Sequence, residues 1–284
     1  MGDEINNVIE FDKFATEQVN ANEQYAMPKF SANLTFLFTE LPFMDRFEAA
    51  ANAGFKAVEY MAPYPYAADA LQAALKANDL VQALFNLPVG DWDNGERGMA
   101  CIPGREAEFK NGVATAITYA QALDCKKINC LSGKLPPGVS REAATATLID
   151  NLKYAAAELK GACIMLVMEP INSYDIPGYF VNRTVEALAI LDAVGSDNLF
   201  IQYDVYHAQR MEGELGATLS QQRSRIGHIQ IADNPGRNEP GTGEINYTWL
   251  LKHIDATGYD GWVGCEYKPK TTTAAGLGWM KTLA

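Results

Sequence analysis

The sequence predicts an α/β protein with a single (β/α)8 barrel, the TIM-barrel fold, formed by residues 27–284. Three observations lead to this fold: eight short apolar runs recur along the chain, helical segments separate them, and no linker rich in proline or serine divides them. Neighbouring parallel strands need a crossover connection, which the helical segments supply. Eight such units in about 255 residues suit a closed barrel better than an open sheet.

The expected strands are short runs of mostly apolar residues. In chain order they cover residues 30–34, 57–61, 81–87, 127–131, 164–168, 199–203, 226–231 and 262–267. The segments between them are rich in Ala, Leu, Glu and Lys, and their apolar residues are spaced by three and four, which indicates amphipathic helices. The clearest helices are expected at residues 44–53, 67–77, 106–123 and 141–159. Gly54, Gly195 and Gly258 fall where helices should end.

The charge of the chain is acidic, with 23 basic and 35 acidic residues and a formal net charge of -12. Such a charge disfavours a general nucleic-acid or membrane-surface binder. No apolar stretch reaches the roughly 18 residues that a membrane span needs. We therefore expect a cytoplasmic protein whose partner is a small molecule, without nucleic acid or membrane, and a homo-oligomer remains open.

Residues 1–26 are polar and acidic and contain no signal-peptide core. We expect them to be an N-terminal extension or an expression remnant, disordered or peripheral to the barrel.

The chain contains five cysteines and no CxxC motif: Cys101, Cys125, Cys130, Cys163 and Cys265. The number is odd, and a disulfide framework is not expected in a chain of this size. Cys130, Cys163 and Cys265 each sit in an apolar, strand-like run. The expectation is therefore buried free thiols in a reducing cytosol.

Oxygen-bearing side chains stand at the C-terminal ends of the last four expected strands: Glu169, Asp204, Gln230 and Glu266. The chemistry of such barrels lies at this end of the strands. Three carboxylates cannot crowd together without a cation, because like charges raise one another's pKa. Oxygen ligands favour Mg²⁺ or Mn²⁺ over Zn²⁺. We predict one divalent metal held by these four residues, with Mg²⁺ first and Mn²⁺ second, although any one of them alone would fit a helix cap or a loop acid.

The strand pattern also places residues one layer deeper in the barrel. Because side chains alternate along a strand, Val167, Gln202, His228 and Gly264 should lie one layer below the expected metal ligands. His228 is therefore expected to fill the barrel interior.

Three further residues are candidates for binding substrate: His207, Arg237 and Lys268. His207 follows Asp204 by three positions and is expected either to orient substrate or a carboxylate, or to be a packed histidine at a strand end. Arg237 and Lys268 are expected to hold a substrate carboxylate, with solvated loop charges as the alternative. The loop at residues 90–104 is long enough for a lid, and equally fits a static surface loop.

Several motifs resemble the hydroxypyruvate isomerases, members of the wider xylose-isomerase-like barrel superfamily. They are IQYDVYH at 201–207, HIQIAD at 228–233, RNEPGTGEINY at 237–247 and CEYKP at 265–269, with FSANL at 30–34 and ALFN at 83–86. The resemblance runs from about residue 27 to the C-terminus. Sugar 3-epimerases of the superfamily usually carry histidine in place of Gln230, so this residue favours the hydroxypyruvate branch.

The resemblance implies a Mg²⁺-type metal on the four strand-end residues and an acid–base pair formed by Glu169 and Glu266. The implied reaction interconverts hydroxypyruvate and tartronate semialdehyde by enediolate proton transfer, so the substrate is a small anionic hydroxy-keto acid. No electrons leave the substrate, and we expect neither nicotinamide nor flavin. Consistent with this, GxGxxG after a first strand and GxxxxGK do not occur.

Four alternatives stay open beside this interpretation. Two are enzymes of the same kind, an isomerase of a four-carbon keto sugar acid (2-oxotetronate type) and a ketose 3-epimerase. The third is the abasic-site endonuclease that shares the barrel, which needs a zinc cluster and many histidines, whereas this acidic chain has three. The fourth is a non-catalytic metal- or sugar-binding barrel.

Overall fold

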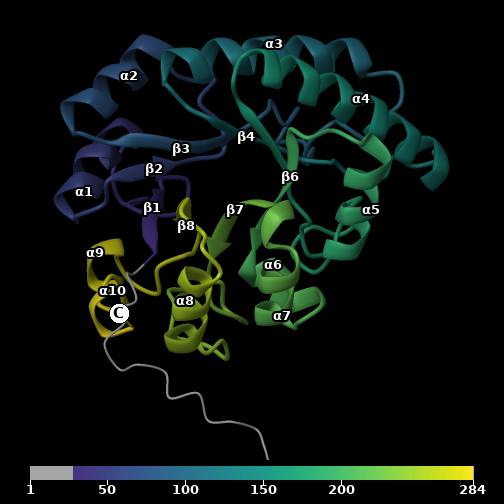
Figure 1. The fold of residues 1–284 in the computed structure, drawn as a ribbon. Helices are drawn as coiled ribbons and strands as arrows, with labels where there is room; N and C mark the ends of the chain where they lie inside the picture. Colours follow the sequence, from purple (N-terminus) through teal and green to yellow (C-terminus); the bar gives the residue numbers. More distant parts are fainter. Residues whose placement is uncertain (1–27, 284) are drawn as a thin grey trace, which may run out of the picture.

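Eight parallel strands close into a barrel in the computed structural model, which describes residues 28–283. Each strand pairs with its neighbours in chain order, and β8 pairs with β1 to complete the ring. Figure 1 shows the helices arranged around the outside of the strands. The α/β class and the single barrel are therefore confirmed, whereas the extension expected at residues 1–26 lies outside the described residues.

The strands match the expected runs to within one or two residues at each end. They are β1 (Lys29–Asn33), β2 (Ala57–Glu59), β3 (Val81–Asn86), β4 (Lys127–Cys130), β5 (Met165–Met168), β6 (Leu199–Asp204), β7 (Ile226–Ile231) and β8 (Trp262–Cys265). Their register aligns the C-terminal ends, because Asp204 on β6 pairs with Gln230 on β7, which in turn pairs with Gly264 on β8.

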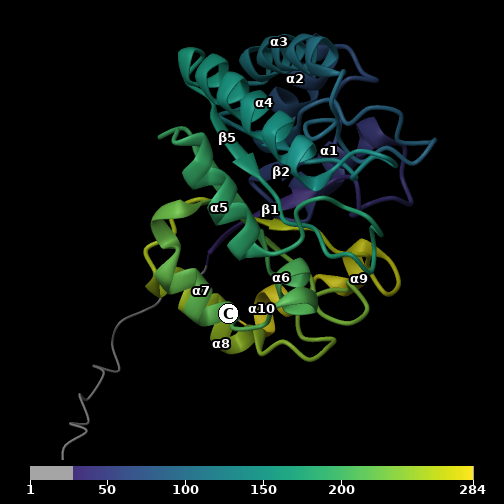
Figure 2. The same cartoon turned by 90° about the vertical axis from the view of Figure 1, so that its right-hand side faces the viewer.

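Helices connect the strands on the outer face, and the four expected helices lie where the apolar spacing placed them. In the described residues the helices are η1 (Phe43–Asp45), α1 (Arg46–Asn52), α2 (Ala68–Ala77), α3 (Glu106–Ala122), α4 (Arg141–Gly161), α5 (Thr184–Val194), α6 (Val205–Met211), α7 (Leu215–Gln221), η2 (Arg223–Arg225), α8 (Tyr247–Ala256), α9 (Thr273–Gly276) and α10 (Trp279–Thr282). Gly195 ends α5 in the left-handed conformation with φ 67°, where glycine avoids the cost of a Cβ. Figure 2 shows α3, α4 and α5 packed beside one another.

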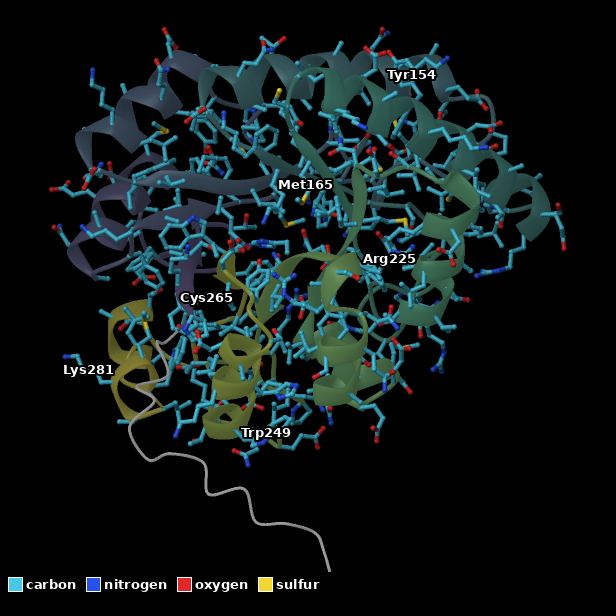
Figure 3. The ribbon with its side chains drawn as sticks, viewed as in Figure 1. Tyr154, Met165, Arg225, Trp249, Cys265 and Lys281 are labelled. Carbon is cyan, nitrogen blue, oxygen red and sulfur yellow. The ribbon has the colours of Figure 1, made fainter. Side chains whose placement is uncertain are left out.

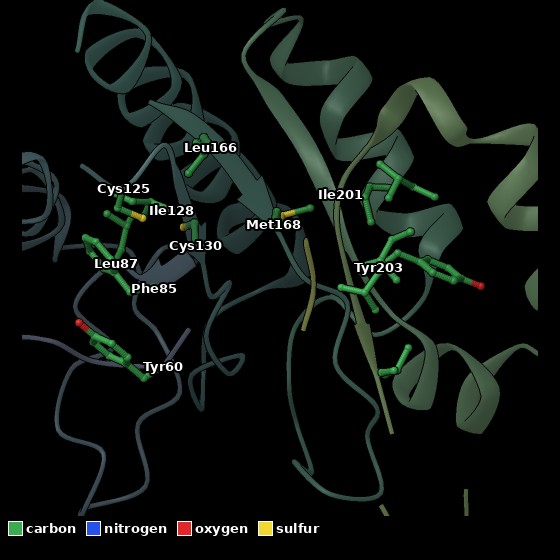
Figure 4. Packing of buried hydrophobic residues seen from close by; sticks show 14 of the residues in the cluster. Tyr60, Phe85, Leu87, Cys125, Ile128, Cys130, Leu166, Met168, Ile201 and Tyr203 are labelled. Atoms are coloured by element: carbon green, nitrogen blue, oxygen red, sulfur yellow. The ribbon is translucent and has the colours of Figure 1, made fainter. Parts of the chain in front are cut away.

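The hydrophobic core fills the layer between the strands and the helices. Figure 4 shows part of it, where Phe85 and Ile128 from β3 and β4 lie near Leu166 from β5. These side chains are fully buried. The side chains that point the other way, into the barrel, are largely polar towards the C-terminal ends of the strands, so the core supports a polar interior.

The seam between β8 and β1 is covered by α9 and α10. The Trp279 ring meets Phe30 edge to face at 5.1 Å, and Trp279 Nε1 donates to the Tyr267 hydroxyl at 3.1 Å. Thr273 Oγ1 accepts a hydrogen bond from the Phe38 backbone at 2.6 Å. The last two short helices therefore tie the end of the described chain to its beginning. Within residues 28–283, no helix combines the length and the apolar character that crossing a membrane requires.

The cysteine expectation is wrong at one position. Cys101, Cys125, Cys130 and Cys265 are buried free thiols, but Cys163 is exposed. Cys163 has φ 59° in the turn between α4 and β5, so it precedes the strand instead of joining it. An apolar run alone does not show where a turn ends and a strand begins.

Candidate active site

The candidate site lies inside the barrel at the C-terminal ends of the strands. Glu169 and Glu266 each follow the last residue of β5 and β8, and Asp204 is the last residue of β6. Figure 3 draws the side chains and labels Met165, the first residue of β5, and Cys265, the last residue of β8. Strand alternation holds one layer deeper, because Gln202 and His228 are buried in the interior as expected.

Three carboxylates and one imidazole converge at the rim of the barrel. Glu169, Asp204, His207 and Glu266 are all buried and each offers one ligand atom, and these atoms lie within 4.8 Å of one another. Asn129 Nδ2 donates to Glu169 Oε2 at 3.0 Å, and the Tyr206 backbone donates to Asp204 Oδ1 at 2.8 Å. Asp204 Oδ2 has no hydrogen-bond partner although it is buried. The strand ends thus bring together the three carboxylates that the sequence placed there.

The two glutamates of this cluster hold protons more tightly than free glutamate does. Burial, followed by the Glu266 and Asp204 carboxylates, raises the pKa of Glu169 well above its usual value. Burial raises the pKa of Glu266 to about 8, although the Arg237 guanidinium acts against this rise. A divalent cation among these oxygens would favour the ionised forms instead.

His207 is fixed as a neutral imidazole with one particular tautomer. Asn172 Nδ2 lies 2.6 Å from His207 Nδ1, and Asn172 Oδ1 accepts from two backbone N–H groups, so the amide must present its nitrogen to the ring. The Nδ1 atom therefore accepts and Nε2 carries the proton. Burial lowers the pKa of His207 to about 4. Because Nε2 is a donor, 3.5 Å from Asp204 Oδ2, His207 is better suited to orienting oxygen atoms than to binding a metal.

Arg237 packs against the carboxylate cluster and is mostly buried, with 15% of its side chain exposed. Its NH2 atom lies 2.7 Å from Glu266 Oε2 and 3.5 Å from Asp204 Oδ2. Burial acts to lower the pKa of Arg237, but the surrounding carboxylates outweigh it and raise the pKa. The guanidinium also lies over the Phe36 and Tyr206 rings, at 4.9 and 5.1 Å. A mostly buried cation thus lies beside the cluster, contributed by a residue that the sequence analysis named as a candidate for binding substrate.

Lys268 is less enclosed than Arg237. Its side chain is exposed, and it lines the same cavity. Its backbone N–H donates to the Arg237 carbonyl at 2.7 Å, which joins the end of β8 to the loop after β7. The structure therefore places both expected cations at the cavity.

Gln230 lies beside Asp204 and is bonded on both sides of its amide. Its Oε1 accepts from Gln202 Nε2 at 2.7 Å, and its Nε2 donates to Glu59 Oε1 at 2.7 Å. Its role as a metal ligand stays a prediction. Glu59 itself was missed by sequence reasoning, which considered only the ends of the last four strands. An acidic residue in the apolar run 57–61 was the signal that could have found it.

The cluster opens into a cavity of about 300 Å³ that reaches the loop after β3. Trp92 and Arg97 from that loop line the cavity together with Arg237 and Lys268. The Arg97 guanidinium stacks on the Trp92 ring at 3.7 Å, and its NH1 donates to the Trp92 carbonyl at 2.9 Å. The loop at residues 90–104 is therefore a wall of the cavity. Whether it moves as a lid stays a prediction.

Comparison with known proteins places this barrel in a family. The xylose isomerase-like TIM barrel family matches residues 47–283. Hydroxypyruvate isomerase of Escherichia coli strain K12 is 59% identical over 254 residues, covering 89% of this chain and 98% of that protein. The chain belongs to the hydroxypyruvate isomerase family of xylose isomerase-like TIM barrels.

Two further relatives show the breadth of this family. The 2-oxo-tetronate isomerase of Cupriavidus necator is 47% identical over 255 residues, covering 90% of this chain and 98% of that protein. A crystal structure described as AP endonuclease, family 2, from Brucella melitensis is 44% identical, with a TM-score of 0.88 over 90% of this chain and 99% of that one. The name of a relative alone therefore does not fix the substrate of this chain.

Proposed function

We propose that this isomerase interconverts hydroxypyruvate and tartronate semialdehyde, with a divalent cation, Mg²⁺ or Mn²⁺, held by Glu169, Asp204, Gln230 and Glu266. The observation that carries the proposal is the buried cluster of three carboxylates at the C-terminal rim of the barrel. The 59% identity to a hydroxypyruvate isomerase supports the choice of reaction.

The donor set fits a hard divalent cation. Three carboxylates and one amide oxygen are the ligand types that Mg²⁺ and Mn²⁺ prefer. Asp204 Oδ2 is buried without a hydrogen bond, which costs free energy unless a cation or a donor satisfies it. A cation bound there would polarise the neighbouring substrate oxygens and stabilise the negative charge that develops when a proton leaves carbon.

The reaction needs one proton moved between adjacent carbons, and the two glutamates are placed for this task. Glu169 and Glu266 reach the cavity from strands β5 and β8, and both are buried. One carboxylate would take the proton from one carbon, while the other returns a proton to its neighbour. His207 Nε2 would donate to a substrate oxygen between them. The burial of both carboxylates limits the access of bulk water to these transfers.

The charges around the cavity favour an anionic substrate. Three carboxylates outweigh a 2+ ion, so an anion binds there only if cations lie close by. Arg97, Arg237 and Lys268 all line the cavity, and Arg237 can meet a carboxylate with two parallel N–H bonds. A neutral ketose carries no carboxylate that these three cations could bind. We therefore assign the substrate carboxylate to Arg237 and Lys268.

The metal site is tested by measuring Mn²⁺ binding with calorimetry. Asp204→Ala should weaken Mn²⁺ binding strongly, because it removes a buried ligand. Asp175→Ala is the matched control, since Asp175 is a carboxylate that lines the same cavity outside the cluster. Unchanged affinity in Asp204→Ala would reject the site.

The substrate is tested by comparing kcat/KM for hydroxypyruvate, a four-carbon keto acid and a neutral ketose. Hydroxypyruvate should be the best of the three, and Arg237→Ala should weaken its binding by about 2–5 kcal/mol while any activity on the ketose changes little. Arg210→Ala serves as the control, because Arg210 lies outside the lining of the cavity. Higher efficiency on the neutral ketose would favour a 3-epimerase instead.

The four-carbon keto acid is the second candidate substrate. The cavity of about 300 Å³ is larger than a three-carbon acid requires, and a relative at 47% identity is named 2-oxo-tetronate isomerase. Highest efficiency on the four-carbon acid would keep the chemistry and change the substrate. An endonuclease is less well supported, because His207 is the one histidine of three that faces the cluster, while His228 and His253 bond elsewhere.

A further inference from the structure

Glu59 is a fully buried carboxylate that the proposed proton transfer does not use. Its Oε2 accepts hydrogen bonds from Ser31 Oγ at 2.8 Å and from His228 Nε2 at 2.9 Å. Its Oε1 accepts from Gln230 Nε2 at 2.7 Å and from Asn33 Nδ2 at 3.2 Å. Each of these four contacts brings a donor to a Glu59 oxygen, so the carboxyl group accepts hydrogen bonds at both of its oxygens.

A carboxyl group that accepts at both oxygens fixes the orientation of a neighbouring amide. The amide that contacts it must present its nitrogen, because both carboxyl oxygens are acceptors. Gln230 Nε2 is thereby held at Glu59, and Gln230 Oε1 is left on the other side of the amide, where Gln202 Nε2 donates to it. A hard cation binds an amide through oxygen. The contact with Glu59 therefore holds the amide with its nitrogen at Glu59 and its oxygen on the other side, where one lone pair of the oxygen accepts from Gln202 and the second is left for a cation.

Asn33 extends the same constraint to Glu266. The Asn33 side chain is itself oriented, because its Oδ1 accepts from the Thr35 backbone at 3.0 Å. Its Nδ2 then donates both to Glu59 Oε1 at 3.2 Å and to Glu266 Oε1 at 3.1 Å. One buried carboxylate on β2 thus contacts Gln230 on β7 directly and is linked through Asn33 to Glu266, the residue that follows β8.

The Glu59 carboxyl group occupies space that is free because Gly264 has no side chain. A Cβ atom at this position would lie 2.3 Å from Glu59 Oε1 and 2.5 Å from Glu59 Oε2, far inside contact distance. Gly264 does not have a positive φ, so space rather than backbone conformation explains the glycine. The lower layer of the barrel is therefore shaped around this carboxylate.

We propose that Glu59 is a positioning residue that orients two of the proposed metal ligands, Gln230 by direct contact and Glu266 through Asn33. This inference rests on the proposed function, since it takes Gln230 and Glu266 to be ligands. Glu59 would act on the metal without touching it.

The first test is the Mn²⁺ affinity of the full chain carrying Glu59→Gln. The new amide has one acceptor oxygen where Glu59 has two, so it cannot accept from all four donors. The orientation of Gln230 is then no longer fixed, and Gln230 can turn and offer its nitrogen to the cation. Loss of such a supporting contact typically weakens metal binding by about 10–100-fold, and we expect a loss in this range. Ser31→Ala is the matched control, because it removes a hydrogen bond to Glu59 at the oxygen that faces away from Gln230. Its Mn²⁺ affinity should stay close to that of the unsubstituted protein.

The decisive test is rescue by exchanging the two groups. In the double variant Glu59→Gln/Gln230→Glu, the amide at position 59 donates to the carboxylate at position 230, and an oxygen again serves as the ligand. This variant should regain most of the Mn²⁺ affinity that Glu59→Gln loses. A purely structural role of Glu59 predicts no such recovery, because the double variant disturbs the interior more than the single one.

If circular dichroism shows that Glu59→Gln does not fold, Gln230→Glu replaces it in the comparison. Two carboxylates are then in contact, and the ligand must lose a proton against that repulsion, so Mn²⁺ should bind at least about tenfold more weakly than to the double variant. Any of three results would overturn this inference and leave the proposed metal site standing. These are equal Mn²⁺ affinities in that comparison, no loss of Mn²⁺ affinity in a folded Glu59→Gln, or no recovery of Mn²⁺ affinity in the double variant. Unchanged affinity in Asp204→Ala would instead reject the proposed metal site, and the inference with it.

Discussion

Replacing Arg237 by methionine should destabilise the protein without metal far more than the protein with metal. The guanidinium is a mostly buried cation that lies 2.7 Å from Glu266 and 3.5 Å from Asp204. Methionine keeps much of the apolar contact with Phe36 and Tyr206, so the change removes mainly the charge. Three buried carboxylates then face one another without a positive partner.

The expected magnitude follows from the burial of the pair. Breaking a buried ion pair by removing one partner typically costs about 3–5 kcal/mol. The raised pKa values of Glu169 and Glu266 allow protons to replace part of the lost charge, which places the expectation near the lower end, at about 3 kcal/mol. A bound divalent cation compensates the carboxylates directly and should reduce the cost to about 1 kcal/mol. By linkage, the difference of about 2 kcal/mol should appear as roughly 30-fold tighter Mn²⁺ binding to the variant.

The assay is urea unfolding followed by circular dichroism, with EDTA and with excess Mn²⁺. Arg210→Met is the control, because Arg210 pairs with Asp175 at 3.5 Å near the surface and should change stability by at most about 1 kcal/mol. Equal losses of stability in Arg237→Met with and without Mn²⁺ would refute the reasoning. Weaker Mn²⁺ binding to the variant would also contradict it.

Three further predictions concern the same site. Glu169→Gln and Glu266→Gln should each slow proton exchange between substrate carbon and solvent deuterium by at least about 10²–10⁴-fold, and near-normal exchange in either variant would exclude its role. Because the pKa of Glu266 is raised to about 8, its protonated form stabilises the metal-free fold fully below the usual pKa of glutamate, and this contribution is lost progressively as the pH rises to about 8; urea midpoints in EDTA should fall between about pH 5 and 8 and level off above that range, and a flat profile would argue against a raised pKa. Asn172→Ala removes the 2.6 Å side-chain donor at His207 Nδ1 and leaves only the 3.5 Å contact from the backbone of residue 172; it should raise the population of the second tautomer of His207, visible in its ¹⁵N shifts, and should cost about 1–3 kcal/mol of stability, whereas unchanged shifts would show that the Asn172 side chain does not fix the ring.

The barrel could be predicted from the sequence because its signal is local and repeated. Each strand is a short apolar run and each helix has its own apolar spacing, so errors stayed within one or two residues at strand ends. The carboxylates at the rim could be predicted for a related reason. In a parallel barrel all C-terminal strand ends share one face, so Glu169, Asp204 and Glu266 had to lie near one another once the strands were found.

The rest of the site depends on contacts that no local pattern records. Glu59 meets His228 across the barrel, 169 positions away in the chain. A three-residue strand does not tell an inward carboxylate from an outward one, because its alternation is too short to establish a phase. The Asn172 contact that sets the tautomer of His207 also needed coordinates, since the two residues lie on different connections between strands.

The hydrogen bond from Asn33 to Glu266 joins residues 233 positions apart, across the seam where β8 meets β1. Ribosomal synthesis delivers Asn33 and Glu59 early and Glu266 almost last, so the two halves of the site cannot meet until nearly the whole barrel has emerged. Contacts of such long sequence separation form late and slowly during folding. A chain whose barrel has not closed would therefore lack the complete metal site. Only molecules that have finished folding would then bind the metal with full affinity.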